Sequence, residues 1–298
     1  MAIDNLWPPV SGVFWATPPS ILDGARWIAG LDGSSFFITI FGALAGAFAG
    51  AWAAQRSAKN GKRRDELTTE IRVVNAAIIL SHAIFDSVLS AKVQYIGPAM
   101  DIYKAGRERY LKELSSSHSV GEKSVSFNLH RFPELPIAVE QLQLLVLQQG
   151  SIQALRAVVR LVEYGGLLRE AIDLRNEYIG KFERKEFSIG FTYPEMYFGL
   201  ATKDGCHQQF SSTMDAIEMY GDNIVYFSRR LCECLSQYGG ILKKELKKIS
   251  SEPVGIVEFD FKKLGREGLC PPPAGYKGWE ESFVEVHRRP RWWRRLID

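Results

Sequence analysis

The 298-residue chain is poor in cysteine and histidine, and its positive and negative charges nearly cancel. The four cysteines lack the spacings of a disulfide framework and stand late in the chain, at Cys206, Cys232, Cys234 and Cys270. A reducing compartment fits this pattern. The net charge of +3 excludes a nucleic-acid interface based on overall basicity, so every electrostatic argument must be local.

Motifs of catalysis and metal binding are also missing. The sequence contains no GxSxG, P-loop or GxGxxG pattern, and no HExxH pattern surrounds its histidines, which are His82, His118, His130, His207 and His287. Cys232 and Cys234 lie two apart on an expected helix and so point in different directions, whereas a zinc site needs four convergent ligands. We therefore expect structural cysteines, no metal, no cofactor and no enzymatic activity.

The segment Glu258-Phe-Asp260-Phe-Lys262 leaves one enzymatic alternative open. Nucleases use a D-x-K spacing to hold a divalent cation and position a lysine, and a strand would place these three charged side chains on one face. The same alternation is typical of any half-buried strand, and no acidic partner is recognisable upstream. We favour the structural interpretation and keep a tethered nuclease as an alternative.

One uncharged run dominates what the sequence does contain. Phe36–Ala54 is a stretch of 19 residues without a charge and without a polar stripe. At 1.5 Å per residue a helix of this length covers roughly 28 Å, close to the thickness of a bilayer core. The sequence therefore predicts one transmembrane helix at residues 36–54.

The charges beside this run predict its orientation. Residues 1–35 carry Arg26 against three aspartates, whereas five basic residues follow the run, namely Arg56, Lys59, Lys62, Arg63 and Arg64. Basic flanks stay cytoplasmic, so we expect a single-pass protein of the bacterial inner membrane with its N-terminus outside. A cleaved signal peptide is the alternative, but the late start of the run and its basic C-terminal flank oppose it.

Tryptophans and glycines add two further expectations about the membrane. Trp7, Trp15 and Trp27 in the Pro-rich segment 1–35 suit the outer headgroup layer, or else this segment is a disordered extracytoplasmic tail. Gly42, Gly46 and Gly50 form a double GxxxG beside a row of alanines. Such a smooth strip permits close helix approach in lipid, so we expect a homo-oligomer or a partner helix packed there rather than chance repetition.

Helical periodicity covers most of the remaining chain and predicts an all-α fold. A seam with alternating steps of three and four residues runs over residues 65–96, as Leu67, Ile71, Val74, Ile78, Ser81, Phe85, Val88, Lys92 and Tyr95. We expect a juxtamembrane helix over residues 55–113 that is interrupted at Gly97-Pro98, and a linker over residues 114–136. A cytoplasmic bundle of long helices is expected over residues 137–250, with an irregular segment at residues 187–204.

The C-terminal tail, residues 251–298, is expected to be irregular with one short strand at residues 254–261. It ends in RRPRWWRRL, in which Arg291, Trp292, Trp293 and Arg294 suit anionic headgroups. The same peptide can stack on nucleic acid or stay solvated. We favour membrane lipid over direct nucleic-acid binding, because the expected anchor already holds the tail on the cytoplasmic side.

The runs GALAGAFAGAWAAQR, RRDELTTEIRVVNAAIIL and KVQYIGPAM give the chain a family resemblance over residues 36–110. They resemble bacterial single-span membrane proteins of anti-phage defence loci, including retron-associated membrane effectors. The resemblance implies a toxin-like effector that perturbs the inner membrane when a cytoplasmic protein or ribonucleoprotein regulator releases it. The alternative function is a membrane-tethered scaffold or signalling subunit that recruits a cytoplasmic partner.

Overall fold

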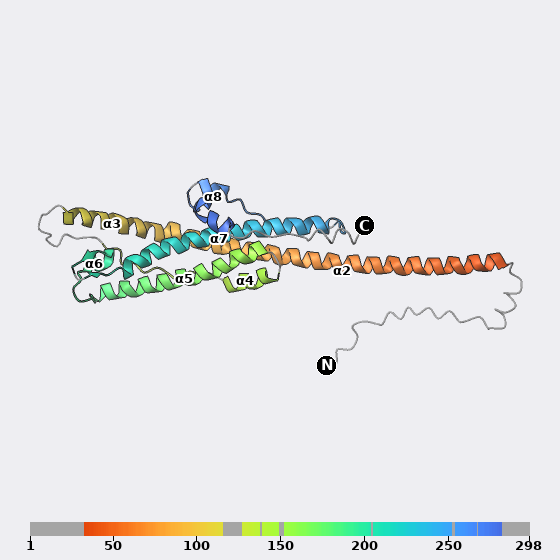
Figure 1. The fold of residues 1–298 in the computed structure, drawn as a ribbon, viewed down its shortest axis with the longest axis horizontal. Helices are drawn as coiled ribbons and strands as arrows, with labels where there is room; N and C mark the ends of the chain where they lie inside the picture. Colours follow the sequence, from red (N-terminus) through yellow and green to blue (C-terminus); the bar gives the residue numbers. More distant parts are fainter. Residues whose placement is uncertain are drawn as a thin grey trace, which may run out of the picture. The chain divides into compact units, whose positions relative to one another are not determined.

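A computed structural model gives the fold, which is mostly helical (Figure 1). It describes residues 33–115, 127–137, 139–148, 152–203, 205–251, 254–266 and 268–281, with the backbone alone for residues 33–44. The chain divides into two compact units, Met1–Arg63 and Arg64–Asp298. Helix α2 (Gly33–Ala91) contributes to both.

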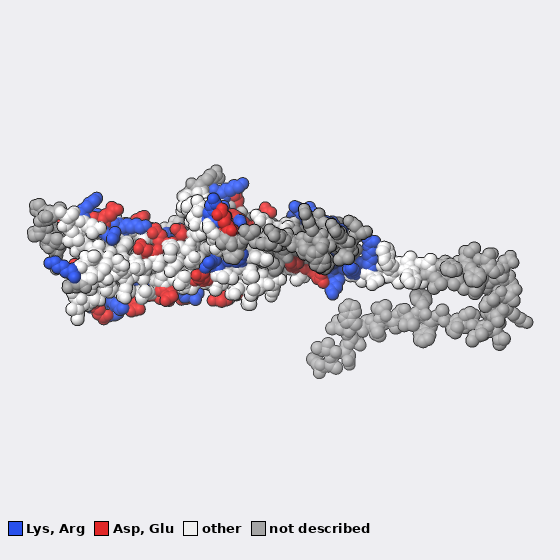
Figure 2. All heavy atoms as spheres, viewed as in Figure 1, with Lys and Arg blue, Asp and Glu red and all other residues white. Residues whose placement is uncertain are grey.

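In the first unit, α2 presents uncharged side chains before its basic residues begin. Every residue from Ala45 to Asn60 is exposed, including Phe48 and Trp52. The described part of this apolar stretch is white in Figure 2, and the blue basic side chains begin where it ends toward the bundle. The expected N-terminal segment, residues 1–35, lies outside the described residues except for its last three.

A helical stretch of the described chain, Ala45–Ser115, is long and apolar enough to cross a membrane. The 18 consecutive residues of this stretch that best meet the criterion for a span are 44% buried. Residues Ala45 to Asn60 are all exposed, so these 18 residues lie in the second unit. A core helix of a bundle meets the same criterion of length and apolarity. Placing the transmembrane helix at residues 36–54 therefore still rests on the sequence.

The second unit is a bundle of three long helical rods (Figure 1). The first comprises α2 from Arg64, a π-helical turn η1 (Lys92–Ile96) and α3 (Gly97–Ser115), and the others are α5 (Ile152–Glu183) and α7 (Gln209–Leu246). Tyr238 on α7 donates to Glu70, and Ser81 donates to the carbonyl of Ser228 at 2.9 Å. These pairs run in opposite directions along the two helices, so α7 is antiparallel to α2.

The predicted seam of α2 forms one wall of the bundle core. Its first seven positions are buried, namely Leu67, Ile71, Val74, Ile78, Ser81, Phe85 and Val88. The hydrogen bond of Ser81 to α7 explains why a hydroxyl is tolerated in this apolar row. Burial of the seam supports the helical bundle expected from the sequence.

Gly97-Pro98 does not break the first rod, because the helix widens before it. The amide of Gly97 donates to the carbonyl of Lys92, five residues earlier, which makes the π-helical turn. A Cβ at Gly97 would lie 2.9 Å from that carbonyl oxygen, so glycine permits the close approach. Proline lacks an amide hydrogen, and the wide turn lets the backbone absorb this loss.

Helix α4 (Val139–Leu147) and residues 127–137 pack against α5. The segment 127–137 falls in the predicted linker and has no regular secondary structure, yet it buries Phe132 and Leu135. Gly165 of α5 lies under Val139, whose methyl carbon would be 3.1 Å from an added Cβ. The helix therefore stays continuous there and uses a glycine for close packing.

The segment 187–204 is more ordered than its composition predicts. It contains α6 (Tyr193–Phe198), whose start has a capping box formed by Thr192 and Glu195. The strands β1 (Ala201–Thr202) and β2 (Gly205–Cys206) then pair antiparallel. Gly199, at φ 63°, ends α6 in the left-handed conformation that glycine adopts readily.

The expected strand at residues 254–261 does not form. Its polar backbone groups bond to helix side chains instead: Asn75 bonds both Gly255 and Val257, and Ser236 donates to Val257. These bonds satisfy the backbone without a neighbouring strand. The segment continues into α8 (Lys262–Arg266), a 3₁₀ turn η2 (Pro273–Tyr276) and α9 (Lys277–Glu281).

Alanine substitutions at two adjacent glycines of α7 are expected to change the free energy of unfolding in opposite directions. A Cβ at Gly239 would lie 3.0 Å from Ile256 and 3.2 Å from Val74, whereas Gly240 has nothing within 4 Å. We expect Gly239→Ala to lower the free energy of unfolding by about 1–3 kcal/mol through overpacking. Gly240→Ala is the matched control and should raise it by about 0.5–1 kcal/mol. Chemical denaturation measures both, and equal effects would contradict this packing.

Candidate functional site

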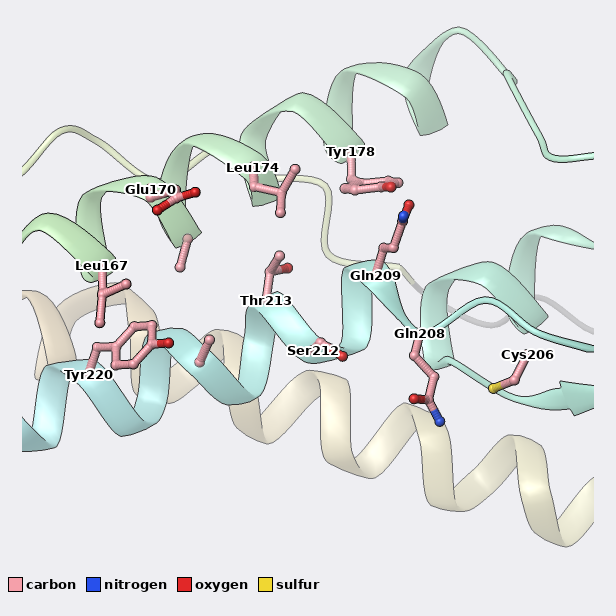
Figure 3. Close-up of a pocket in the computed structure, with 12 residues that line it drawn as sticks. Leu167, Glu170, Leu174, Tyr178, Cys206, Gln208, Gln209, Ser212, Thr213 and Tyr220 are labelled. Atoms are coloured by element: carbon pink, nitrogen blue, oxygen red, sulfur yellow. The ribbon is translucent and has the colours of Figure 1, made fainter. Parts of the chain in front are cut away.

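A groove between α5 and α7 is a concave site in the described part of the chain (Figure 3). It has a volume of about 670 Å³. Leu167, Glu170, Leu174 and Tyr178 project from α5 over Thr213 and Tyr220 of α7. Four small side chains also line it, namely Ala171 of α5 and Ser212, Thr213 and Ala216 of α7.

The lining of this groove is almost free of charge. Among the described residues that line it, Glu170 alone is charged. The hydroxyl of Thr213 is already occupied, since it donates to the carbonyl of Phe210 at 2.7 Å. Burial raises the pKa of Tyr178, so its phenol stays protonated at neutral pH. The groove has an apolar floor, and glutamine amides and serine and tyrosine hydroxyls lie along its edges. This arrangement can accept the side chains along one face of an amphipathic helix.

Arg175 lies close to this groove on α5 and is fully buried. Its guanidinium stacks over Phe132 at 3.7 Å and donates to the carbonyl of His130 at 2.8 Å. In the part of the chain that the structure describes, no carboxylate forms an ion pair with it. Burial lowers the pKa of Arg175 to about 10. The side chain, together with Asn176, fastens residues 127–137 to α5.

Neither the groove nor Arg175 was predicted from the sequence. A signal for Arg175 was present, because it stands three residues after Ile172 and four before Ile179, on the same apolar face of α5. The groove had a weaker signal, since it depends on how two separate helices face each other. Small residues at facing positions become visible as a feature only when the pairing of α5 with α7 is known.

The three glycines of the expected packing face lie on α2 at helical spacing. Gly46 and Gly50 have nothing within 4 Å of an added Cβ, so this strip is open. Gly42 is helical, and its surroundings fall outside the described side chains. Phe48 and Trp52 point roughly opposite to Gly46 and Gly50, at 100° per residue, and are 80% and 62% exposed. The helix therefore has one smooth face and one bulky face.

The basic residues expected beside the membrane also lie on α2. Arg56 contacts the ring of Trp52 at 5.3 Å, and Arg64 pairs with Asp65 at 3.1 Å. Lys59, Lys62 and Arg63 complete the flank. The tail residues Arg291, Trp292, Trp293 and Arg294 lie outside the described residues, so their lipid contact stays a prediction.

The strand on which the nuclease alternative places Asp260 and Lys262 does not form. Residues 254–260 are not a strand, and Asp260 accepts a hydrogen bond at 2.9 Å from the backbone amide of Lys262. Asp260 thus caps the start of α8. The carboxylate has a structural role, and the alternation that suggested a common face for the three charged residues is lost.

The cysteines point toward different elements. Cys232 contacts the carbonyl of Ile78 on α2, whereas Cys234 approaches Gln153 on α5. Burial raises the pKa of Cys232 to about 12, which keeps it a neutral thiol. Among the described residues, no three His, Cys, Asp or Glu side chains are grouped to hold a metal ion.

Comparisons of the chain with models of known protein families, with curated proteins and with solved structures find no match.

Proposed function

We propose that the chain is a membrane-anchored, non-enzymatic effector of a bacterial antiviral defence system, held in the inner membrane by residues 36–54. The open strip at Gly46 and Gly50 carries this proposal. The bundle buries its own core without using that strip, and every described residue around it is exposed. An uncharged helix with a smooth face is stable when lipid surrounds it and another helix packs on it.

The basic flank supports an orientation with the bundle in the cytoplasm. Five basic residues from Arg56 to Arg64 follow the span, and the preceding 35 residues are net acidic. The bundle then faces the compartment in which a cytoplasmic protein or a ribonucleoprotein can bind it. Direct contact of the chain with nucleic acid is not required.

A partner can control the chain, because silent and active assemblies of such helices differ little in free energy. A regulator that binds the silent assembly more tightly shifts the population toward it, and its loss releases the active oligomer. The active oligomer would perturb the membrane through the span itself. The resemblance to effectors of anti-phage loci supports this order of events.

The groove between α5 and α7 favours a second candidate, a membrane-tethered scaffold. Its apolar floor and polar edges fit a helix of a cytoplasmic partner. A scaffold would bind this partner without harming the membrane. The two functions therefore differ in what happens when the chain is produced alone.

Production of the full chain without its native partners should depolarise bacterial cells, as read with a potential-sensitive dye. A chain that starts at Lys59 lacks the span and should stay soluble and silent. The double variant Asp260→Ala/Lys262→Ala should act like the unaltered chain, because the Asp260 carboxylate only caps the backbone amide of Lys262 at the start of α8. A reporter fused after Asp298 should be active in the cytoplasm. Harmless accumulation in the membrane would favour the scaffold, and a toxic soluble chain would favour an enzyme.

A further inference from the structure

The C-terminal end of α7 carries lysines that no carboxylate in the described structure neutralises. Lys244, Lys247 and Lys248 are exposed, and we call them the lysine end. Lys243 is half-buried beside them, and Glu245, also half-buried, is the one acidic residue within this turn. None of the four lysines forms an ion pair with a residue that the structure describes. A positive charge near the C-terminus of a helix interacts favourably with the helix dipole. Three exposed lysines are more than this interaction needs.

The antiparallel course of α7 brings this end to the place where the chain enters the bundle. Tyr238 donates to Glu70 of α2. From that pair, Leu246 is eight residues on along α7, about 12 Å, and Arg64 is six residues back along α2, about 9 Å. The lysine end therefore reaches the end of the bundle at which Arg64 stands.

This end of the bundle is close to the proposed membrane along the chain. Arg64 is the tenth residue after Ala54 on α2, so it lies at most about 15 Å of helix from the end of the proposed span. The headgroup layer takes up about 5–8 Å of that length. The remaining gap is comparable to the Debye length of about 8 Å at physiological ionic strength, and a lysine side chain shortens it further. The lysine end is thus within electrostatic reach of the headgroups.

We propose that the lysine end binds anionic phospholipid headgroups of the cytoplasmic leaflet and so docks the bundle on the membrane. The inference rests on the proposed anchor at residues 36–54. A bilayer is favoured over RNA as the polyanion, because the anchor holds the leaflet at high effective concentration. Each basic residue near an anionic leaflet contributes about 1 kcal/mol, which corresponds to about a fivefold preference. The contact would add to that of the basic flank on α2.

Lysine footprinting of the full chain in nanodiscs tests the docking. Acetylation by an amine-reactive ester is compared between discs of phosphatidylcholine and discs that also contain phosphatidylglycerol. We expect modification of Lys244, Lys247 and Lys248 to slow about fivefold in the anionic discs and to recover at high salt. Lys112, Lys185 and Lys203 are internal controls, since they are exposed and lie at the opposite end, where Phe182 contacts Phe210 at the start of α7.

Charge-matched variants provide an independent measurement. Lys244→Gln/Lys247→Gln/Lys248→Gln should retain fewer phosphatidylglycerol molecules in native mass spectrometry than Lys112→Gln/Lys185→Gln/Lys203→Gln. Equal retention, or the same footprint in both discs, would overturn this inference and leave the anchor intact. Protection by added RNA but not by anionic lipid would also overturn it. Failure of the chain to enter discs of either composition would instead overturn the anchor, and the docking with it.

Discussion

Gly46→Ile is expected to weaken association of the span by about tenfold or more and to relieve depolarisation of cells. Gly46 is the centre of the Gly42, Gly46 and Gly50 strip and has open space around it. A β-branched side chain there holds two backbones apart, and in lipid no hydrophobic effect compensates for the lost contact. A loss of about 1.4 kcal/mol corresponds to a tenfold change in the dissociation constant. Crosslinking in membranes and the potential-sensitive dye measure the two effects.

Phe48→Ile is the matched control for this substitution. It places the same side chain two residues away, on the bulky face with Trp52, and keeps the span apolar. We expect it to insert, to crosslink and to depolarise cells like the unaltered chain. If Phe48→Ile impairs association as much as Gly46→Ile, the smooth face is not the packing face. If Gly46→Ile crosslinks normally yet loses toxicity, association is not what harms the membrane.

Arg175→Ala is expected to lower the free energy of unfolding by about 3–5 kcal/mol. The side chain is fully buried, and its removal opens a cavity under Phe132 and leaves the carbonyl of His130 without its donor. Residues 127–137 would then keep their bonds to Asn176 and the ion pair of Arg131 with Glu183 on α5. Denaturation followed by far-ultraviolet circular dichroism measures the loss.

Arg175→Met separates the role of volume from that of charge. Methionine fills similar space without a buried cation, and the pKa of Arg175, lowered to about 10, reflects the cost of that cation. We therefore expect Arg175→Met to change the free energy of unfolding by less than about 1.5 kcal/mol. Arg169→Ala, on the exposed face of α5, should change it by less than about 0.5 kcal/mol. A loss with Met as large as with Ala would mean that the bond to His130 dominates.

The sequence predicted the helices better than the segments that join them. The row from Leu67 to Val88 repeats over six turns, so its burial was readable from spacing alone. The same spacing predicted long helices over residues 137–250, where α5 and α7 lie. In contrast, α6 is six residues long and depends on the capping box of Thr192 and Glu195, a signal too short to stand out in an aromatic segment.

Other features could not be read from local pattern because partners distant in sequence create them. Alternation at residues 254–261 was that of a strand, but Asn75 and Ser236 satisfy its backbone from other helices. The groove depends on the packing of α5 against α7, whose lining residues are far apart in sequence. The membrane span, the basic tail and the defence role remain predictions from sequence.

The distance in sequence between α2 and α7 sets an order of events during synthesis. Ser81 bonds to Ser228, which is 147 residues later, so the apolar seam of α2 has no α7 to cover it until that length of chain has been made. At about 5–20 residues per second this takes roughly 7–30 s, after the proposed span has left the ribosome. The seam is apolar enough to be inserted by mistake as a second span. Glu70, Arg72 and Asp86 interrupt it with charge, which raises the cost of insertion and would keep the nascent bundle on the side of the membrane that we propose for it.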